Sequence, residues 1–192
     1  LPASHTDEHV EAMLTALKTV DFDVLVYPYA KSGTGSSTAQ QTIATWIKSI
    51  QDDEGKNVTV VLPNYTADSE YVINSVQGVT LSDGSNLTAY ETAAWIGGIT
   101  AGASVTKSNT GQKFVGAIDV SPRMTRSEQE TAIKAGKFLL DVDRSQNVTV
   151  VADINSLTTT NQTKSDILKQ NRSVRTACGI RSDIQSVWDA NI

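Results

Sequence analysis

The sequence predicts an α/β fold, with a mixed β-sheet flanked by helices, a β-hairpin and a long C-terminal helix. Short apolar runs that end at proline alternate with segments of helical periodicity in the first sixty residues. Thr88 and Thr125 are each followed three residues later by glutamate, which is the spacing of a capping box at a helix start. Two largely apolar runs, at 138–142 and 148–152, flank a polar turn at 143–147, as in a hairpin. We expect residues 1–192 to form a single domain.

The first half of the chain predicts a parallel strand pair with helical connections. Thr6 is the expected N-cap of the first helix, because acidic residues follow it and Val10, Leu14 and Leu17 recur at helical spacing. The next expected elements are a strand at 23–28, a loop at 31–37, a helix at 38–53 and a strand at 57–62. This β–α–β order predicts that the two strands are parallel.

The second half predicts further strands and three more helices. We expect strands at 71–76 and 115–120, a turn at Asp83-Gly84, a helix at 89–103, a helix from Thr125, hairpin arms at 138–142 and 148–152, and a last helix at 163–188. Gly98 and Gly102 lie one helical turn apart, which predicts a close approach by another backbone. The last helix takes its apolar positions from Ile167, Leu168, Val174, Ile180, Ile184 and Val187, with an irregularity near Gly179.

Bulk composition excludes several classes of protein. The net charge is −5 and the sequence pI is about 5.0, which argues against nucleic acid as the main partner, because binding phosphates needs clustered Lys and Arg. No apolar run is long enough for a membrane span. The single cysteine, Cys178, has no partner for an internal disulfide.

Two patterns resemble metal sites but lack essential ligands. His5 and His9 are one helical turn apart, yet Thr6 stands where a metalloprotease has its glutamate and no third ligand follows. The run 141–147 begins like a calcium loop, but Gln146 occupies the position of the required glycine. We therefore expect solvated histidines, a polar hairpin turn, and no metal or cofactor.

The glycine-rich segment 33–37 leaves one enzymatic alternative open. It follows a predicted strand and precedes a predicted helix, which is the setting of an anion site at a helix N-terminus. It lacks the lysine of a phosphate-binding loop, so a flexible connection is favoured. The alternative function is a nucleotide-binding α/β enzyme that uses this loop.

Four charged residues are candidates for salt bridges within or between subunits. Arg172 and Arg175 are three residues apart on the last predicted helix, and Arg126 and Glu128 lie at the start of an earlier one. From the sequence alone, an ordinary solvated helical face is the favoured interpretation for Arg172 and Arg175.

Two motifs near the end of the chain resemble a known family. Residues 153–159 (DINSLTT) and 171–176 (NRSVRT) resemble the "DINTLT … KNRVIRTLD" signature of contractile tail sheath proteins of bacteriophages. Further segments resemble conserved sheath segments in the same order, at 21–28, 52–56, 71–76, 93–103, 107–110, 119–123 and 132–136. In the family an Arg-x-Leu-Asp sequence is usual, whereas Cys178 stands here in place of the acid, so a salt bridge by that aspartate is not expected.

The resemblance implies a structural protein and not an enzyme. Such subunits stack as rings around a tail tube, adding strands to the sheets of their neighbours, and contract to drive the tube through the host envelope. The implied partners are other sheath subunits, the tail tube protein and the baseplate, and the implied location is a virion tail assembled in the host cytoplasm. The relatives expected are from phages or phage-tail-like particles of Gram-positive bacteria, and a bacteriocin-like or secretion injection device is an alternative. The family also has an N-terminal extension and a C-terminal domain or arm, so we expect this chain to be a core domain fragment.

Overall fold

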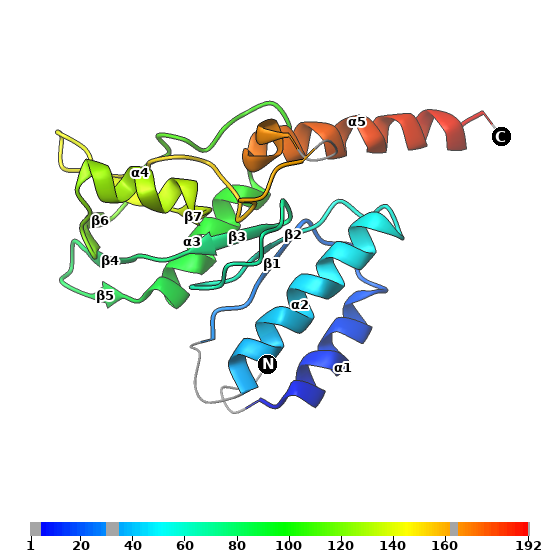
Figure 1. Ribbon diagram of the computed structural model, residues 1–192, viewed down its shortest axis with the longest axis horizontal. Coiled ribbons are helices and arrows are strands. Elements are labelled where there is room, and N and C mark those ends of the chain that lie inside the picture. The colour runs from blue at the N-terminus through cyan, green and yellow to red at the C-terminus, as the bar shows by residue number, and fades with distance from the viewer. Residues whose placement is uncertain (1–4, 30–34, 162–164, 192) are drawn as a thin grey trace.

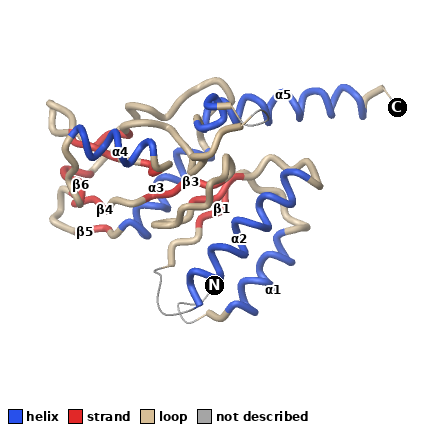
Figure 2. Tube along the Cα trace, in the orientation of Figure 1, coloured by secondary structure: helices blue, strands red, loops and turns tan. Residues whose placement is uncertain are grey.

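The protein is built on a four-stranded parallel sheet with helices on both faces. The computed structural model describes residues 5–29, 35–161 and 165–191. The strands β1 (Val24–Val26), β2 (Thr59–Val61), β3 (Val72–Ser75) and β7 (Lys137–Phe138) lie in the order β1-β2-β3-β7 (Figures 1 and 2). Helix α2 (Gly35–Asp52) connects β1 to β2, and these strands pair in parallel with Val24 opposite Thr59. The predicted β–α–β unit is confirmed.

Strand alternation divides the core into two layers. Successive side chains of a strand point to opposite faces of the sheet. Val60 therefore packs with α1 (Asp7–Leu17) and α2, whereas its neighbour Val61 packs with α3 (Ala89–Ala101). Because both faces of the sheet are covered, β1 and β2 are mainly apolar and do not alternate with polar residues.

Antiparallel strands extend this core at one end of the molecule. Strands β4 (Gly78–Leu81), β5 (Asn86–Leu87) and β6 (Ala117–Ser121) form a sheet in the order β5-β4-β6, and β8 (Leu140–Val142) forms a hairpin with β9 (Val148–Val150). The predicted Asp83-Gly84 turn joins β4 to β5, with Gly84 at a φ of +87°. The structure thus combines parallel and antiparallel strands, as predicted for a mixed α/β fold.

The predicted hairpin arm at 138–142 is divided between two sheets. Phe138 pairs with Ser75 in the parallel sheet, whereas the hairpin begins at Leu140. The buried side chain of Gln77 takes part in this change, because its Oε1 accepts a hydrogen bond from the Leu140 amide at 2.8 Å. A distant glutamine thus supplies a partner for the backbone where the chain passes from one sheet to the next.

The helix starts follow the capping residues. Thr6, Thr88 and Thr125 are the N-caps of α1, α3 and α4 (Arg126–Lys134), and Glu91 and Glu128 complete two capping boxes. The predicted loop at 31–37 is wrong in its second part and untested in its first. Residues 35–37 form the first turn of α2 and not a loop, while residues 30–34 lie outside the described part of the chain.

The last predicted helix is divided in two. A short 3₁₀ helix, η1 (Asp166–Lys169), ends at Gln170, whose extended backbone forms a bridge with Ile154, and α5 (Asn171–Asp189) begins after it. Residues 162–164 of the predicted helix lie outside the described residues. The expected irregularity near Gly179 is absent from α5, which runs through that residue unbroken. No helix in the described ranges is long and apolar enough to cross a membrane.

The close approach on α3 occurs at Gly97, and the prediction for Gly98 and Gly102 was wrong. A Cβ added at Gly97 would lie 2.3 Å from Cγ2 of Val26, whereas one added at Gly98 would meet nothing within 4 Å. At Gly102 the nearest atom is the helix's own Gly98 carbonyl oxygen. Gly97 therefore allows α3 to lie directly on β1.

This difference predicts opposite effects of the same substitution at adjacent positions. Gly97→Ala should destabilise the protein by about 1–3 kcal/mol, because the stiff Val26 side chain has to move within a packed core. Gly98→Ala should stabilise it by up to about 1 kcal/mol, because alanine favours the helix and fills open space. Chemical denaturation of both variants measures the two effects, and equal destabilisation would contradict the packing described.

Candidate functional site

The Asp153 carboxylate is the centre of a buried hydrogen-bond network, which we call the Asp153 clasp. Its Oδ2 accepts from Nη2 of Arg175 at 2.8 Å and from the Asn109 amide at 2.9 Å, and its Oδ1 accepts from Nδ2 of Asn171 at 2.8 Å. Nη2 of Arg175 also donates to the Lys107 carbonyl at 2.7 Å. The clasp joins the loop after α3, the chain beyond β9 and the start of α5.

Burial makes the charges of the clasp depend on one another. The Asp153 side chain is 1% exposed and that of Arg175 is 13% exposed. Removing a carboxylate from water is costly unless an opposite charge and hydrogen bonds compensate for it. Three donors surround Asp153, whereas Nε and Nη1 of Arg175 have no hydrogen-bond partner among the described residues. The arginine is therefore held mainly through Nη2.

The residues after Asp153 continue the network into the parallel sheet. Nδ2 of Asn155 donates to the Leu168 carbonyl at 2.7 Å, which fixes η1. The Ser156 hydroxyl donates to the Ser69 carbonyl at 3.1 Å, and the Ser156 amide donates to the Val72 carbonyl at 2.7 Å. Hydrogen bonds thus connect residues 153–159 (DINSLTT) to β3 on one side and to η1, just before α5, on the other.

A second carboxylate, that of Asp68, holds the end of the same segment. Its Oδ1 accepts from the amides of Thr158 and Thr159 at 2.7 and 2.9 Å and from the Thr158 hydroxyl at 2.9 Å. The hydrogen bond from the Thr159 backbone, followed by that from Thr158, holds the pKa of Asp68 well below its usual range. Asp68 is exposed, so this anchor remains open to solvent.

Gly136 lets the turn after α4 lie against this segment. Its φ is +69°, and a Cβ at this position would lie 2.8 Å from the Ser156 carbonyl oxygen. A side chain is therefore excluded both by the backbone conformation and by the close contact. This contact explains the glycine of the segment at 132–136.

Arg181 forms a second anchor for α5 that the sequence analysis missed. Its Nη2 donates to Oε1 of Gln51 at 2.7 Å and its Nη1 donates to the Gln51 carbonyl at 3.1 Å. Nδ2 of Asn57 donates to the Cys178 carbonyl at 3.1 Å. Because these partners are more than 120 residues away along the chain, no local pattern could identify them.

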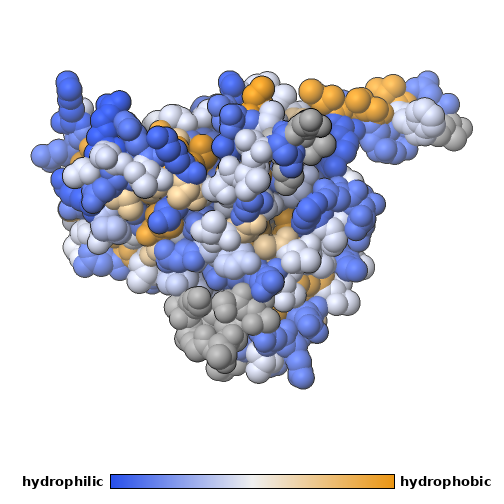
Figure 3. Space-filling model, in the orientation of Figure 1, coloured by the Kyte–Doolittle hydropathy of each residue, from blue (hydrophilic) through white to orange (hydrophobic). Residues whose placement is uncertain are grey.

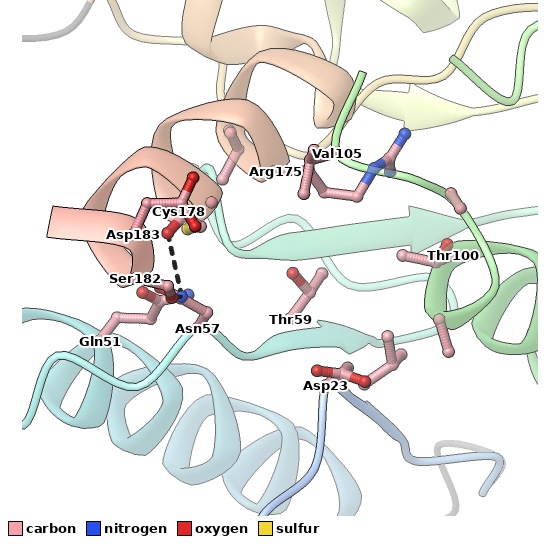
Figure 4. Close-up of a pocket in the computed structure, with 15 residues that line it drawn as sticks. Asp23, Gln51, Asn57, Thr59, Thr100, Val105, Arg175, Cys178, Ser182 and Asp183 are labelled. Atoms are coloured by element: carbon pink, nitrogen blue, oxygen red, sulfur yellow. Dashed lines mark hydrogen bonds between the residues drawn. The ribbon is translucent and has the colours of Figure 1, made fainter. Parts of the chain in front are cut away.

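A cavity of about 410 Å³ lies beside these anchors (Figure 4). Asp23 and Thr59 line it from the amino ends of β1 and β2, Thr100 from the end of α3, and Cys178 and Asp183 from α5. Ligands of open parallel sheets bind at the carboxyl ends of the strands, whereas this cavity lies at the amino ends of β1 and β2. Burial raises the pKa of the Cys178 thiol and thereby disfavours the reactive thiolate.

The other predicted salt-bridge residues do not meet in one site. Arg126 pairs with Glu130 at 3.3 Å on an exposed helical face, where an ion pair contributes little. Glu128 caps α4 by accepting from the Thr125 amide at 2.7 Å, and this backbone hydrogen bond lowers the pKa of Glu128. Arg172 is exposed and makes no ion pair within the described ranges. A role of these residues between subunits stays a prediction.

Both histidines make hydrogen bonds at or near the start of α1. Nδ1 of His9 accepts from the Thr6 amide at 3.0 Å and so takes the usual place of glutamate in a capping box. His5 hydrogen-bonds the Tyr27 hydroxyl, whose pKa is raised to about 12, mainly by burial. His5 is therefore not the solvated residue that the sequence predicted. Across the described ranges, no three His, Cys, Asp or Glu side chains are grouped to hold a metal.

The segment that resembles a calcium loop contains a turn at 143–147, which the carboxylate of Asp143 holds together. Oδ1 of Asp143 accepts from the amides of Ser145 and Asn147 at 2.7 and 2.9 Å. The backbone of Asn147 is the main cause of the lowered pKa of Asp143. The carboxylate thus stabilises the β8–β9 hairpin, as expected for a polar turn.

The clasp predicts a large difference between two neighbouring arginines. Arg175→Met should lower the free energy of unfolding by about 3 kcal/mol or more, because it leaves a buried carboxylate without its charge partner. Arg172→Met is the matched control and should change it by less than about 0.5 kcal/mol. Urea denaturation measures both, and the Asp153→Asn/Arg175→Met double variant should lose less than the sum of the single losses. Equal effects at Arg172 and Arg175 would refute the clasp.

Asp68 predicts a dependence of stability on acid. Because its folded pKa is depressed, its contribution is fully present above the unfolded pKa of about 4 and is lost as pH falls toward the folded value. Asp68→Asn should therefore lower the melting temperature at pH 7, and the gap to the unmodified protein should narrow below about pH 4. Thermal unfolding across this range provides the measurement, and a gap that widens in acid would contradict this sign.

Comparison with known proteins shows that the chain is similar to tail sheath proteins. Residues 3–156 match the family described as "Phage tail sheath protein central domain". The chain is 34% identical over 89% of its length to the XkdK protein of the phage-like element PBSX of Bacillus subtilis, and 29% identical over 95% to the tail sheath protein of Clostridium phage phiCD119. It covers 36% and 49% of these proteins, so it spans less than half of their length.

Solved structures extend the similarity to the whole described fold. The sheath tail protein of Desulfitobacterium hafniense is 36% identical and superimposes with a TM-score of 0.89, over 97% of this chain and 44% of that one. The contracted helical sheath of the anti-feeding prophage has a TM-score of 0.67 at 14% identity, over 100% of this chain and 54% of that one, and shares the fold. The chain belongs to the phage tail sheath protein family, as the order of its sequence motifs predicted.

Proposed function

We propose that this chain is the core of a structural subunit of a contractile tail sheath. The subunits polymerise as stacked rings around a tail tube and contract to drive the tube through the host envelope. The match of residues 3–156 to the central domain of tail sheath proteins carries this proposal. The family consists of structural proteins, so the chain is not an enzyme.

The Asp153 clasp suits a subunit that transmits force. Contraction replaces one set of contacts between subunits by another, while each subunit keeps its own fold. The motif residues Asp153, Asn171 and Arg175 are used for contacts within the chain, and their carboxylate and amide groups are buried. They fix α5 to the loop after α3 and to the chain beyond β9, so the exchangeable contacts are left to the exposed surface.

The proposal includes partners and a location. The subunit binds further sheath subunits, the tail tube protein and the baseplate, and acts in a virion tail that is assembled in the bacterial cytoplasm. Residues 1–192 act as one core domain of a longer subunit. The fold shared with a helical sheath in its contracted state supports self-association.

A bacteriocin-like or secretion injection device is the second candidate. The similarity to XkdK of a phage-like element and the fold shared with the anti-feeding prophage favour it. Particles purified from the native host distinguish the two, because a phage carries nuclease-resistant DNA in a capsid and a tail-like device carries none.

The nucleotide-binding alternative has little support from the described structure. Residues 33 and 34 lie outside the described part, and 35–37 begin α2. Equilibrium binding of ATP tests it, because micromolar affinity that is lost on replacing Gly35 and Ser36 would favour an enzyme over a sheath subunit.

Electron microscopy of the full-length protein tests the proposed function. We expect rings or tubes with a hollow centre, because sheath subunits surround a tube. Particles that remain strictly monomeric at high concentration would contradict the proposal.

A further inference from the structure

Three helices of this protein begin with the same hydrogen-bond arrangement, but one of them uses a different side chain. At the starts of α1, α3 and α4, the backbone amide of the N-cap threonine donates to the side chain three residues later. That side chain is Glu91 in α3 and Glu128 in α4, and each accepts at 2.7 Å. In α1 it is His9, whose Nδ1 accepts at 3.0 Å.

The cap of α1 depends on a neutral imidazole. Nδ1 of His9 lies 3.0 Å from the Thr6 amide and 3.1 Å from the Thr6 hydroxyl. A neutral ring nitrogen can accept a hydrogen bond, whereas both nitrogens are donors once the ring is protonated. Protonation therefore removes the acceptor of the Thr6 amide and places a positive charge at the positive end of the helix dipole. Because histidine changes its charge between about pH 5 and 8, the change falls in mild acid.

The two glutamates remain acceptors over the same range. Free glutamate loses its proton near pH 4, at about 4.3. The hydrogen bond from the Thr88 backbone lowers the pKa of Glu91, and that from the Thr125 backbone lowers the pKa of Glu128. The caps of α3 and α4 therefore keep their ionised acceptors in mild acid.

The acidic residues of α1 do not replace the lost acceptor. They are Asp7, Glu8 and Glu11, and all three are exposed. None of them lies three or four residues from His9, which is the spacing at which side chains of a helix meet. They moderate the repulsion between a charged imidazole and the helix dipole, but they cannot give Nδ1 back its lone pair.

The elements beside α1 bring few charges toward its start. Helix α2 packs against α1 and has no charged residue before Lys48, in its last two turns. The segment 24–29, which includes β1, contains no carboxylate, and its Tyr27 and Tyr29 contact His5. His5 lies one turn before His9 and also gains a proton in this range, and like charges at that spacing repel.

We propose that the start of α1 is a pH-sensitive cap, which holds at neutral pH and opens in mild acid while the starts of α3 and α4 stay closed. The proposal goes beyond the sheath function and does not depend on it. Val10 and Leu14 of α1 are 0% and 3% exposed in the layer that covers one face of the parallel sheet. The Val10 amide donates to the Thr6 carbonyl, so this buried residue follows directly on the cap.

Amide hydrogen exchange of the full-length protein tests the proposal. Protection at the three helix starts is compared at about pH 7.5 and 5.5, after correction for the intrinsic effect of pH on exchange. We expect protection at the start of α1 to fall about two- to tenfold in acid, which is the effect of losing a helix cap. Protection at the starts of α3 and α4 should stay unchanged, so these helices are internal controls.

The variant His9→Gln identifies the group responsible. Glutamine is a usual residue of a capping box, and its amide oxygen accepts a hydrogen bond at either pH. We expect this variant to show no difference in protection at α1 between the two pH values. Unchanged protection at α3 and α4 would show that the variant is folded.

Each other outcome overturns the proposal. Equal protection of α1 at both pH values in the unmodified protein would mean that His9 does not control the cap. A fall of similar size at all three helix starts would mean a general loosening in acid. A fall at α1 that persists in His9→Gln would assign the effect to another group.

Discussion

Burial of the Asp153 carboxylate is the constraint on which the arrangement of the second half of the chain depends. A carboxylate that is 1% exposed is tolerated only when its charge and its lone pairs are matched. Its donors come from the loop after α3 and from two turns of α5, which are separated by some sixty residues. If any of these segments moved away, the buried Asp153 carboxylate would lose a donor and its charge would be less well compensated. The clasp therefore acts as one unit.

The orientation of α5 follows from this unit together with Arg181. The clasp fixes the first turns of the helix, and Arg181 fixes the next turn against the end of α2 and the start of β2. The remainder of the helix extends beyond the body (Figure 1). An amphipathic helix held by its polar side presents its apolar side outward, which is the reverse of a helix that packs on its own core. A segment with the pattern of a core helix thus has an exposed apolar side in the described structure (Figure 3).

Local signals predicted local structure well. Capping boxes at Thr88 and Thr125 depend on residues three positions apart, and the helices begin at both positions as predicted. The strand runs of β1, β2 and β3 were recognisable because both faces of the parallel sheet are buried. The division of the arm at 138–142 and the close approach at Gly97 were not predictable, because each depends on a partner from another element, Gln77 in one case and Val26 in the other.

The sequence by itself determined the α/β class, the starts of α1, α3 and α4, the polar turns and the family, since these depend on short-range patterns and on the order of motifs. Only the tertiary structure decided what the DINSLTT and NRSVRT motifs do. Hydrogen bonds between Asp153, Asn109 and Arg175 connect residues that no spacing along the chain relates. The same distinction applies to α5: periodicity identified Ile180, Ile184 and Val187 as one face, but whether that face is buried depends on which side of the helix Arg175 and Arg181 attach to the body.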